Sequence, residues 1–247
     1  MNYQDHKCCV MLVDSHVHLY EFSNDELRSF SGMILVSVAE DVKSSMHVLK
    51  LTEEFSNVNP CIGIHPWNVD KIPFSDVTVI ENLVKNNDVR CLGEVGLDLR
   101  FVPDTIDKQR RFFNEFLRMA REYDLVLNIH SPDAWREVFE MLIKADVSRV
   151  MFHWYTGPLD LISDLTEQGY YISINAAIKV QEKSRKVAET VPLRFMLTES
   201  DGPYEYRGIK LTPIMIKDTV NEIAKVRGMD AETIEDSVYF NYTKLFK

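Results

Sequence analysis

Short aliphatic runs recur along the chain, and each is followed by a longer polar segment whose apolar residues have helical spacing. This alternation is typical of repeated βα units, in which a buried parallel strand precedes each helix. Eight runs predict strands at residues 10–14, 33–39, 58–64, 90–95, 125–130, 149–153, 170–174 and 194–198. Helical candidates between them include residues 44–55, 107–122, 134–145, 159–168 and 212–227.

The candidate helix at 107–122 has one clear apolar stripe, formed by Phe112, Phe113, Phe116, Leu117 and Ala120. Eight strands in 247 residues match the usual size of a single (β/α)₈ TIM barrel, whereas a doubly wound open sheet uses fewer strands. No low-complexity segment or linker divides the sequence. We therefore expect one barrel domain over residues 1–247, with residues 231–247 as a terminal helical cap.

The charge balance limits the kinds of partner. The chain carries 38 acidic and 28 basic residues, a net charge of −10, which argues against gripping a long duplex through many phosphates. The four cysteines show no C-x-x-C spacing, and we expect reduced thiols. The apolar run at 8–13 is short for a signal peptide, and no stretch approaches the roughly 20 apolar residues of a membrane span. These features predict a cytoplasmic protein without a membrane or an obligate protein partner.

Candidate chemistry begins with the histidine pair His16 and His18 at the end of the first predicted strand. Alternate residues of a strand share one face, so the two imidazoles can reach one metal ion. The pair alone is weak evidence. It gains weight because the ends of later strands also carry metal-binding or phosphate-binding side chains, namely His65, Glu94, His130, His153 and Asp201. In a barrel these strand ends converge on one face, where the active site is built.

Glu94 is favoured as a ligand, because a carboxylate at the end of a buried strand costs several kcal/mol unless it is paired or binds a metal. Asp98 and Glu199 are candidates for acceptors that orient the imidazoles of metal-binding histidines. His6 and His47 lie away from the strand ends and are assigned to the surface.

The succession H-x-H, G-I-H-P, G-E-V-G-L-D, I-H-S, F-H and E-S-D-G-P-Y resembles the TatD family of metal-dependent hydrolases, within the wider amidohydrolase-like barrels. The resemblance runs from Asp14 to Phe246 and includes Arg207-Gly208 and the closing N-Y-T-K-L-F. It implies that His16, His18, Glu94 and Asp201 hold one metal ion. It also implies that Glu94, His130 and His153 hold a second, with Glu94 bridging and His65 beside the substrate phosphate.

The sequence departs from the family pattern around these motifs. Ser200 replaces a threonine, Arg100 stands where an aromatic residue is usual, and the segment 153–157 reads H-W-Y-T-G instead of the more common H-S/C-F-S/T-G. The segment 209–212 also differs from the usual lysine and asparagine. These positions are expected at the rim, so they affect substrate identity more than hydrolytic chemistry.

The resemblance implies a deoxyribonuclease, such as one that removes 3′ nucleotides from single strands, and the acidic surface suits only short or single-stranded DNA. Two divalent ions roughly 3.5–4 Å apart would activate a hydroxide, and Asp201 would accept its proton. His65, with Arg100, Arg207 or Lys210, would offset phosphate charge. The aromatic residues expected near the mouth, which stack on bases or pack under loops, are Trp67, Trp154, Tyr155, Tyr204 and Tyr206.

Two other functions stay open. The same ligands serve hydrolysis of an ester or amide, such as an aminoacyl-tRNA or a small cyclic amide, although Glu94 stands where dihydroorotase-like relatives carry a modified lysine. A non-catalytic barrel would lack one or more ligands, and all are present here. The donor set suits Zn²⁺, Mn²⁺ or Co²⁺ by ligand softness, and the family is usually described as Mg²⁺-dependent.

Overall fold

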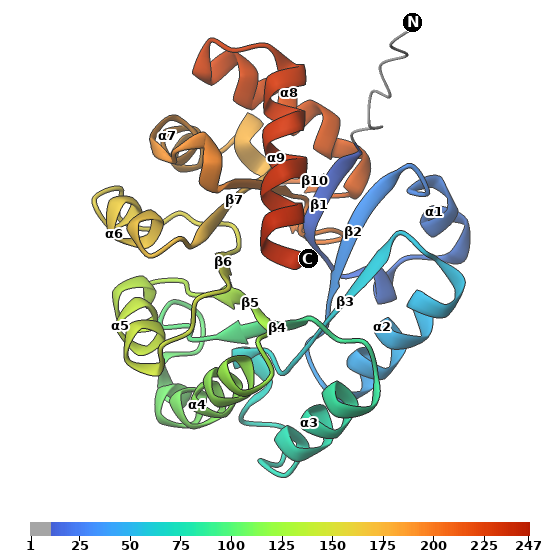
Figure 1. The fold of residues 1–247 in the computed structure, drawn as a ribbon, viewed down its shortest axis with the longest axis vertical. Helices are drawn as coiled ribbons and strands as arrows, with labels where there is room; N and C mark the ends of the chain where they lie inside the picture. Colours follow the sequence, from blue (N-terminus) through green and yellow to red (C-terminus); the bar gives the residue numbers. More distant parts are fainter. Residues whose placement is uncertain (1–10) are drawn as a thin grey trace, which may run out of the picture.

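The computed structural model describes residues 11–247, in which eight parallel strands form one curved sheet in the chain order β1 to β8 (Figure 1). The strands are β1 (Leu12–Val17), β2 (Met33–Val38), β3 (Val58–Ile62), β4 (Cys91–Gly96), β5 (Val126–His130), β6 (Val150–Phe152), β7 (Tyr171–Asn175) and β8 (Met196–Glu199). Helices surround the sheet, and the predicted (β/α)₈ barrel is confirmed.

The outer layer contains helices of uneven length. They are α1 (Asn24–Ser29), α2 (Val42–Glu54), α3 (Asp76–Asn86), α4 (Ile106–Glu122), α5 (Trp135–Ala145), α6 (Leu161–Glu167), α7 (Glu182–Thr190), α8 (Ile216–Arg227) and α9 (Ala231–Phe246). The stripe predicted on α4 is buried against the barrel. Helix α2 begins at Asp41, whose carboxylate accepts a hydrogen bond from the backbone of Ser44 at 2.7 Å. Sequence patterns named no helix at α1, α3 or α7.

The first strand differs most from its prediction. β1 continues to Val17, so His16 lies within the strand and His18 directly follows it. The predicted start at residue 10 lies outside the described residues, as do His6, Cys8 and Cys9. The other predicted strands agree with the observed ones to within two residues at each end. The assignment of all 247 residues to one domain stays a prediction.

Side chains bridge the seam between β8 and β1. The Thr198 hydroxyl donates to the Val13 carbonyl at 2.6 Å, and the Ser15 hydroxyl donates to the Thr198 carbonyl at 2.9 Å. The Ser200 hydroxyl donates to the buried Asp14 carboxylate at 2.5 Å. The seam therefore holds β1, which carries His16, beside the segment that follows β8.

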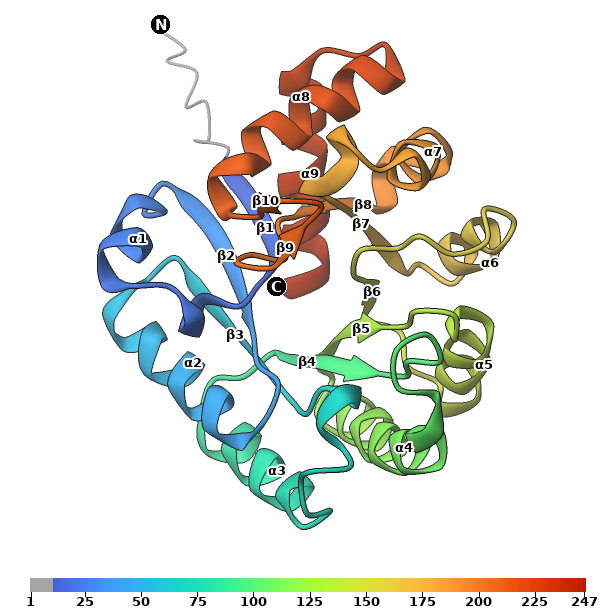
Figure 2. The same ribbon diagram turned by 180° about the vertical axis from the view of Figure 1, so that it is seen from behind.

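The two ends of the barrel are covered differently. Helix α9, the predicted cap, crosses one end, where Asn241 donates to the backbone carbonyls of Leu193 and Met196 at 2.8 Å each (Figure 1). A hairpin of β9 (Glu205–Tyr206) and β10 (Ile209–Lys210) lies in front of the opposite end in the reverse view (Figure 2). That end is the mouth formed by the carboxyl ends of the strands.

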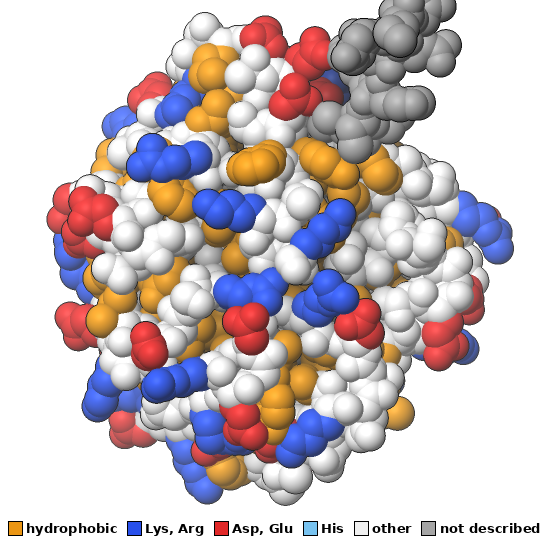
Figure 3. Space-filling model, viewed as in Figure 1, with side chains coloured by type: hydrophobic (Ala, Val, Ile, Leu, Met, Phe, Trp, Pro, Cys, Tyr) orange, Lys and Arg blue, Asp and Glu red, His pale blue; other side chains and the backbone are white. Residues whose placement is uncertain are grey.

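The surface around α9 carries Lys and Arg side chains near its centre, with fewer Asp and Glu side chains among them (Figure 3). Basic side chains therefore gather at the centre of this face, although the net charge of the whole chain is −10. No helix within residues 11–247 is long and apolar enough to cross a membrane.

The expectation of reduced thiols is wrong for one pair, because Cys61 of β3 and Cys91 of β4 form a disulfide. Their Cα atoms lie 4.4 Å apart, since the register of the two strands places these residues directly opposite each other. Thirty positions separate them in sequence, and only strand pairing shows that they are neighbours.

Candidate metal centre

His16 and His18 project from the first strand towards two carboxylates. Both residues are buried, and the Nε2 atoms of both lie 3.3 Å from Asp201 Oδ1. The distances from these nitrogens to Glu94 Oε2 are 3.4 Å and 3.6 Å. We call His16, His18, Asp201 and this oxygen of Glu94 the first cluster.

The spacing in the first cluster fits a metal ion. Four donors about 2.0–2.1 Å from a shared ion lie about 3.3–3.4 Å apart in a tetrahedron. The measured distances of 3.3–3.6 Å match this spacing. His16 Nε2 is completely buried and has no hydrogen-bond partner, which is costly unless the nitrogen serves as a ligand.

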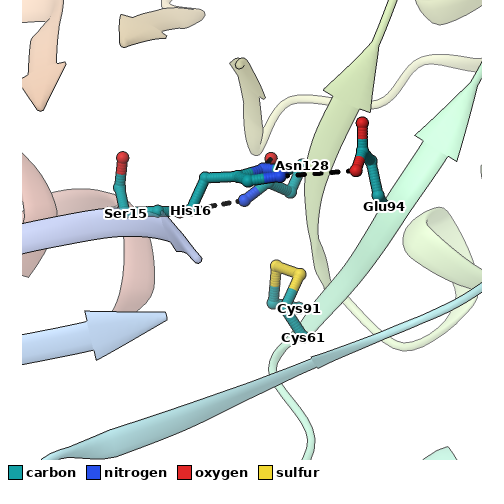
Figure 4. Close-up of a disulfide and its surroundings, with 6 residues drawn as sticks. All are labelled: Ser15, His16, Cys61, Cys91, Glu94 and Asn128. Carbon is teal, nitrogen blue, oxygen red and sulfur yellow. Dashed lines mark hydrogen bonds and ion pairs between the residues drawn. A yellow bond between two sulfur atoms is a disulfide. The ribbon is translucent and has the colours of Figure 1, made fainter. Parts of the chain in front are cut away.

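The opposite nitrogen of His16 indicates which tautomer the ring adopts. Nδ1 lies 2.8 Å from Asn128 Oδ1, and the amide of Asn128 is oriented by donating to the Ser15 carbonyl at 3.0 Å (Figure 4). Nδ1 must therefore donate, which leaves the lone pair of Nε2 free to bind a metal ion.

The second cluster forms around the other carboxylate oxygen of Glu94. Oε1 lies 2.5 Å from His130 Nδ1, 2.8 Å from His153 Nε2 and 3.2 Å from His65 Nε2. The side chains of these histidines are buried. His130 ends β5, His153 directly follows β6 and His65 comes shortly after β3. The two oxygens of Glu94 thus face two groups of imidazoles.

Carboxylates behind the second cluster contact its imidazoles. Asp98 Oδ2 lies 2.8 Å from His130 Nε2, so this nitrogen donates. When Nδ1 gives up the proton that it shares with Glu94, its lone pair faces the centre. Glu199 Oε1 lies 3.6 Å from His153 Nδ1, too far for a hydrogen bond. Glu199 instead accepts hydrogen bonds from Ser173, from Asn175 at 3.2 Å and from the Trp154 backbone at 2.8 Å.

His65 differs from the other imidazoles in its proton placement. Its Nδ1 accepts a hydrogen bond from the Trp67 backbone N–H at 3.1 Å. In the neutral ring the proton therefore lies on Nε2, which faces Glu94 and cannot offer a lone pair there. Burial lowers the pKa of His65, which favours this neutral form. His65 is thus suited to donating a hydrogen bond, as expected for a residue beside a phosphate.

Backbone conformation at the strand ends aims these side chains. Gly96 has φ of 144°, and a Cβ there would lie 2.0 Å from the His130 carbonyl oxygen. Asp201 and Trp154 adopt the left-handed region at φ of 58° and 36°, which costs on the order of 1–2 kcal/mol each. The Asp201 N–H donates to the His16 carbonyl at 2.9 Å, which helps to hold this conformation.

The charges of the centre are those of a cation site. Burial alone lowers the pKa of His16, but attraction to Glu94 and Asp201 raises it. Burial alone raises the pKa of Glu94, but the surrounding imidazoles, His65 first, lower it. The pKa of Asp201 is also lowered, against the effect of burial, by its 3.3 Å ion-pair contacts with His16 and His18. Both carboxylates are therefore ionised at neutral pH, and protons or metal ions must balance them.

The centre forms the floor of a cavity of about 250 Å³ at the barrel mouth. Its walls carry the aromatic side chains of Trp67, Phe101, Trp135, Trp154, Tyr204 and Tyr206. Tyr155 does not line the cavity, because it packs in the core. Lining carboxylates come from Glu21, Glu40, Glu94 and Asp201, whereas Arg100 is the one lining arginine among residues 11–247.

The two arginines proposed for phosphate binding lie in different places. Arg100 lines the cavity, but its guanidinium forms two hydrogen bonds to Asp133, at 2.7 and 2.9 Å. Arg207 lies outside the cavity lining, exposed, and donates to the Val180 carbonyl at 3.0 Å. Lys210 is also outside the lining and contacts Glu26 at 3.4 Å. The structure therefore does not bring Arg207 or Lys210 to the centre.

Two functional side chains had no role in the sequence analysis. Asn128 orients His16, and its place two residues before His130 on the same strand face could have indicated it. Asp14 accepts hydrogen bonds from Ser200 and from the His16 N–H, at 2.5–3.3 Å, and its burial raises its pKa to about 7. No local signal separates Asp14 from an ordinary residue at the end of a strand.

Comparison with known families places this geometry in context. The family model described as TatD related DNase matches residues 13–247. A metal-dependent hydrolase of Methanocaldococcus jannaschii, named as uncharacterized, is 30% identical, and the alignment covers 96% of this chain and 98% of that protein.

Two further matches extend the comparison. A human protein named deoxyribonuclease TATDN3 is 28% identical, with 96% of this chain and 95% of that protein covered. The crystal structure of YjjV, a TatD homologue from Escherichia coli K12, superposes with a TM-score of 0.88 at 24% identity and covers 95% of this chain and 97% of that one. This last likeness supports the fold.

Proposed function

The chain belongs to the TatD family of metal-dependent hydrolases, and from that premise we propose that it hydrolyses phosphodiester bonds in short or single-stranded DNA. The observation that carries the proposal is the position of Glu94, whose two oxygens face separate groups of imidazoles on the floor of an aromatic-walled cavity. A shared carboxylate between two ligand groups is the arrangement expected of a two-metal hydrolase.

The donors divide naturally between two divalent ions. His16, His18 and Asp201 with one oxygen of Glu94 would hold the first, and His130 and His153 with the other oxygen would hold the second. When bound, such ions supply a water activated for attack and neutralise charge on the phosphate. Mg²⁺, Mn²⁺ and Zn²⁺ are the candidates.

The protein's own groups position the substrate and move the proton. Asp201, ionised at neutral pH, accepts the proton of the attacking water at its carboxylate. His65 Nε2–H donates a hydrogen bond to a non-bridging phosphate oxygen. Asp98 and Asn128 orient His130 and His16, so that each imidazole keeps a lone pair towards the centre.

The cavity favours a locally held substrate. Its lining contains four carboxylates, Glu21, Glu40, Glu94 and Asp201, and Arg100 is already paired with Asp133. Such a lining repels phosphates unless cations are bound, and it cannot track a long backbone. The aromatic walls suit unpaired bases. A human relative named deoxyribonuclease supports DNA as the substrate.

The test is metal add-back with end-labelled single-stranded DNA. Chelator-treated protein should release no nucleotides, and Mg²⁺, Mn²⁺ or Zn²⁺ should restore release. Duplex DNA of the same sequence should be cleaved more slowly, because its bases are not available to the walls. If every ion fails on DNA while an aminoacyl ester or a cyclic amide is turned over, the enzyme acts on carbonyl carbon and the nuclease proposal is wrong.

A further inference from the structure

One wall of the cavity is assembled from three aromatic rings that support one another. The Trp154 ring meets the rings of Tyr204 and Tyr206 edge-on, with centroid distances of 5.9 and 5.3 Å. Trp154 directly follows His153 of the second cluster, whereas the two tyrosines come from the segment after β8. We call Trp154, Tyr204 and Tyr206 the aromatic wall.

The polar atoms behind the aromatic wall are already satisfied by the protein. Gln181 accepts a hydrogen bond from Trp154 Nε1 at 2.8 Å and donates to the Tyr206 hydroxyl at 3.1 Å. The Trp154 backbone N–H donates to Glu199 at 2.8 Å. The indole therefore has no free donor to offer a ligand, and the Tyr206 hydroxyl already accepts a hydrogen bond. The wall presents mainly ring surface to the cavity.

The wall is also exposed where a ligand would contact it. Tyr204 is 46% exposed, although large aromatic side chains usually bury most of their area. All three rings and Gln181 line the same cavity as His153 and Asp201. A group linked to a phosphate at the centre can therefore reach the rings without leaving the cavity.

We propose that the aromatic wall is a stacking site for one nucleobase next to the reacting phosphate, with Gln181 as its positioning residue. The inference rests on the proposed function, because it takes the ligand to be a nucleotide. The site recognises that a base is present, since every base has a π-face, and it does not read base identity through the engaged polar atoms of Trp154 and Tyr206.

The test measures binding, so that it does not depend on cleavage. Metal-loaded protein is titrated calorimetrically with thymidine 5′-monophosphate and with deoxyribose 5-phosphate, which differ only in the base. We expect the nucleotide to bind about 5- to 150-fold more tightly, the range for stacking of one base. The monophosphates of the other three bases should bind within about tenfold of thymidine.

The variants separate stacking from general damage. Tyr204→Ala and Trp154→Leu should reduce the ratio of the two dissociation constants towards one, and the exposed Phe240→Leu on α9 should leave it unchanged. Gln181→Leu should also lower the ratio. Gln181→Glu should restore it, because a carboxylate can accept from both Trp154 and Tyr206.

Equal binding of the two wild-type ligands would overturn the inference, as would an undiminished ratio in both Tyr204→Ala and Trp154→Leu. Strong preference for one base would overturn the claim that identity is not read. A clear base dependence without any DNA cleavage would support the wall and count against the nuclease proposal, so the two failures are distinguishable.

Discussion

The two clusters around Glu94 use the same types of ligand but are built differently. In the first cluster the histidine nitrogens stand 3.3–3.6 Å from two carboxylate oxygens. In the second, two imidazoles approach a single oxygen of Glu94 to 2.5 and 2.8 Å. The first is backed by the amide of Asn128, whereas the second is backed by the carboxylate of Asp98.

This difference indicates which cluster has the ligand spacing of a metal site. The first already has the donor spacing of a tetrahedral site, about 3.3–3.4 Å, and adds the charge of Asp201 to the shared charge of Glu94. In the second, two imidazole nitrogens lie within 2.8 Å of one Glu94 oxygen, closer than the ligands around a tetrahedral ion. We therefore expect the first cluster to bind its ion more tightly, and the second to depend more on the acceptors behind its imidazoles.

The largest effect should come from Glu94→Gln, because it removes the charge that both clusters share. We expect nucleotide release from labelled DNA to be lost. Metal analysis after gel filtration should find neither ion bound. The loss should exceed the roughly 10–100-fold effect of removing an outer acceptor. Retention of two ions in a folded variant would contradict the bridging role.

Asp201→Asn breaks only the first cluster. We expect it to abolish turnover and to lower the bound metal from about two ions to about one, with the remaining ion in the second cluster. The variant should stay folded, since the amide keeps the shape of the side chain, but its metal-free melting temperature should fall because the ion pairs with His16 and His18 are lost. Near wild-type turnover would remove Asp201 from its assigned role.

Asp98→Asn should weaken only the second cluster, by about 10–100-fold in metal affinity, because His130 loses its charged partner. The measurement is a competitive titration with a chromophoric chelator, in which the weaker of two binding phases should shift. Glu199→Gln is the matched comparison and should act less on His153, because its carboxylate is 3.6 Å away. A shift in the tighter phase instead would reverse the assignment of the two clusters.

The smallest effect concerns pH and the metal-free protein. The pKa of His153 is about 9, since the Glu94 and Glu199 carboxylates outweigh the lowering by burial and by His16. A raised imidazole pKa stabilises the folded state fully below its ordinary value of 6.5, and that contribution is lost as pH rises through about 9. Thermal melting after chelator treatment should therefore show falling stability from pH 6.5 to 9.

Metal-loaded protein provides the control for this pH experiment. Bound ions replace the protons on the imidazoles, so the fall in melting temperature over the same pH range should be smaller. An equal fall in both forms would show that other groups cause it.

Sequence patterns were sufficient to predict much of the fold, because the burial of a strand or helix shows in the spacing of apolar residues within a short segment of the chain. Parallel strands that are covered on both sides need continuous apolar runs, and these runs located all eight strands of the barrel. The positions of Glu94, His130 and His153 at strand ends predicted that the three side chains lie near one another. The sequence could not place Arg207, which lies outside the cavity lining, because a motif indicates proximity in the chain and not the direction in which a long exposed side chain points.

What the sequence alone determined was the barrel and the set of chemical groups at its mouth, because both follow from local periodicity and from the convergence of strand ends. Tertiary structure decided which nitrogen of each imidazole is free. His16 takes its tautomer from Asn128, a residue 112 positions away, and His65 takes the opposite one from its neighbour Trp67. The position of a proton depends on the partner across a hydrogen bond, and only the folded chain brings such partners together.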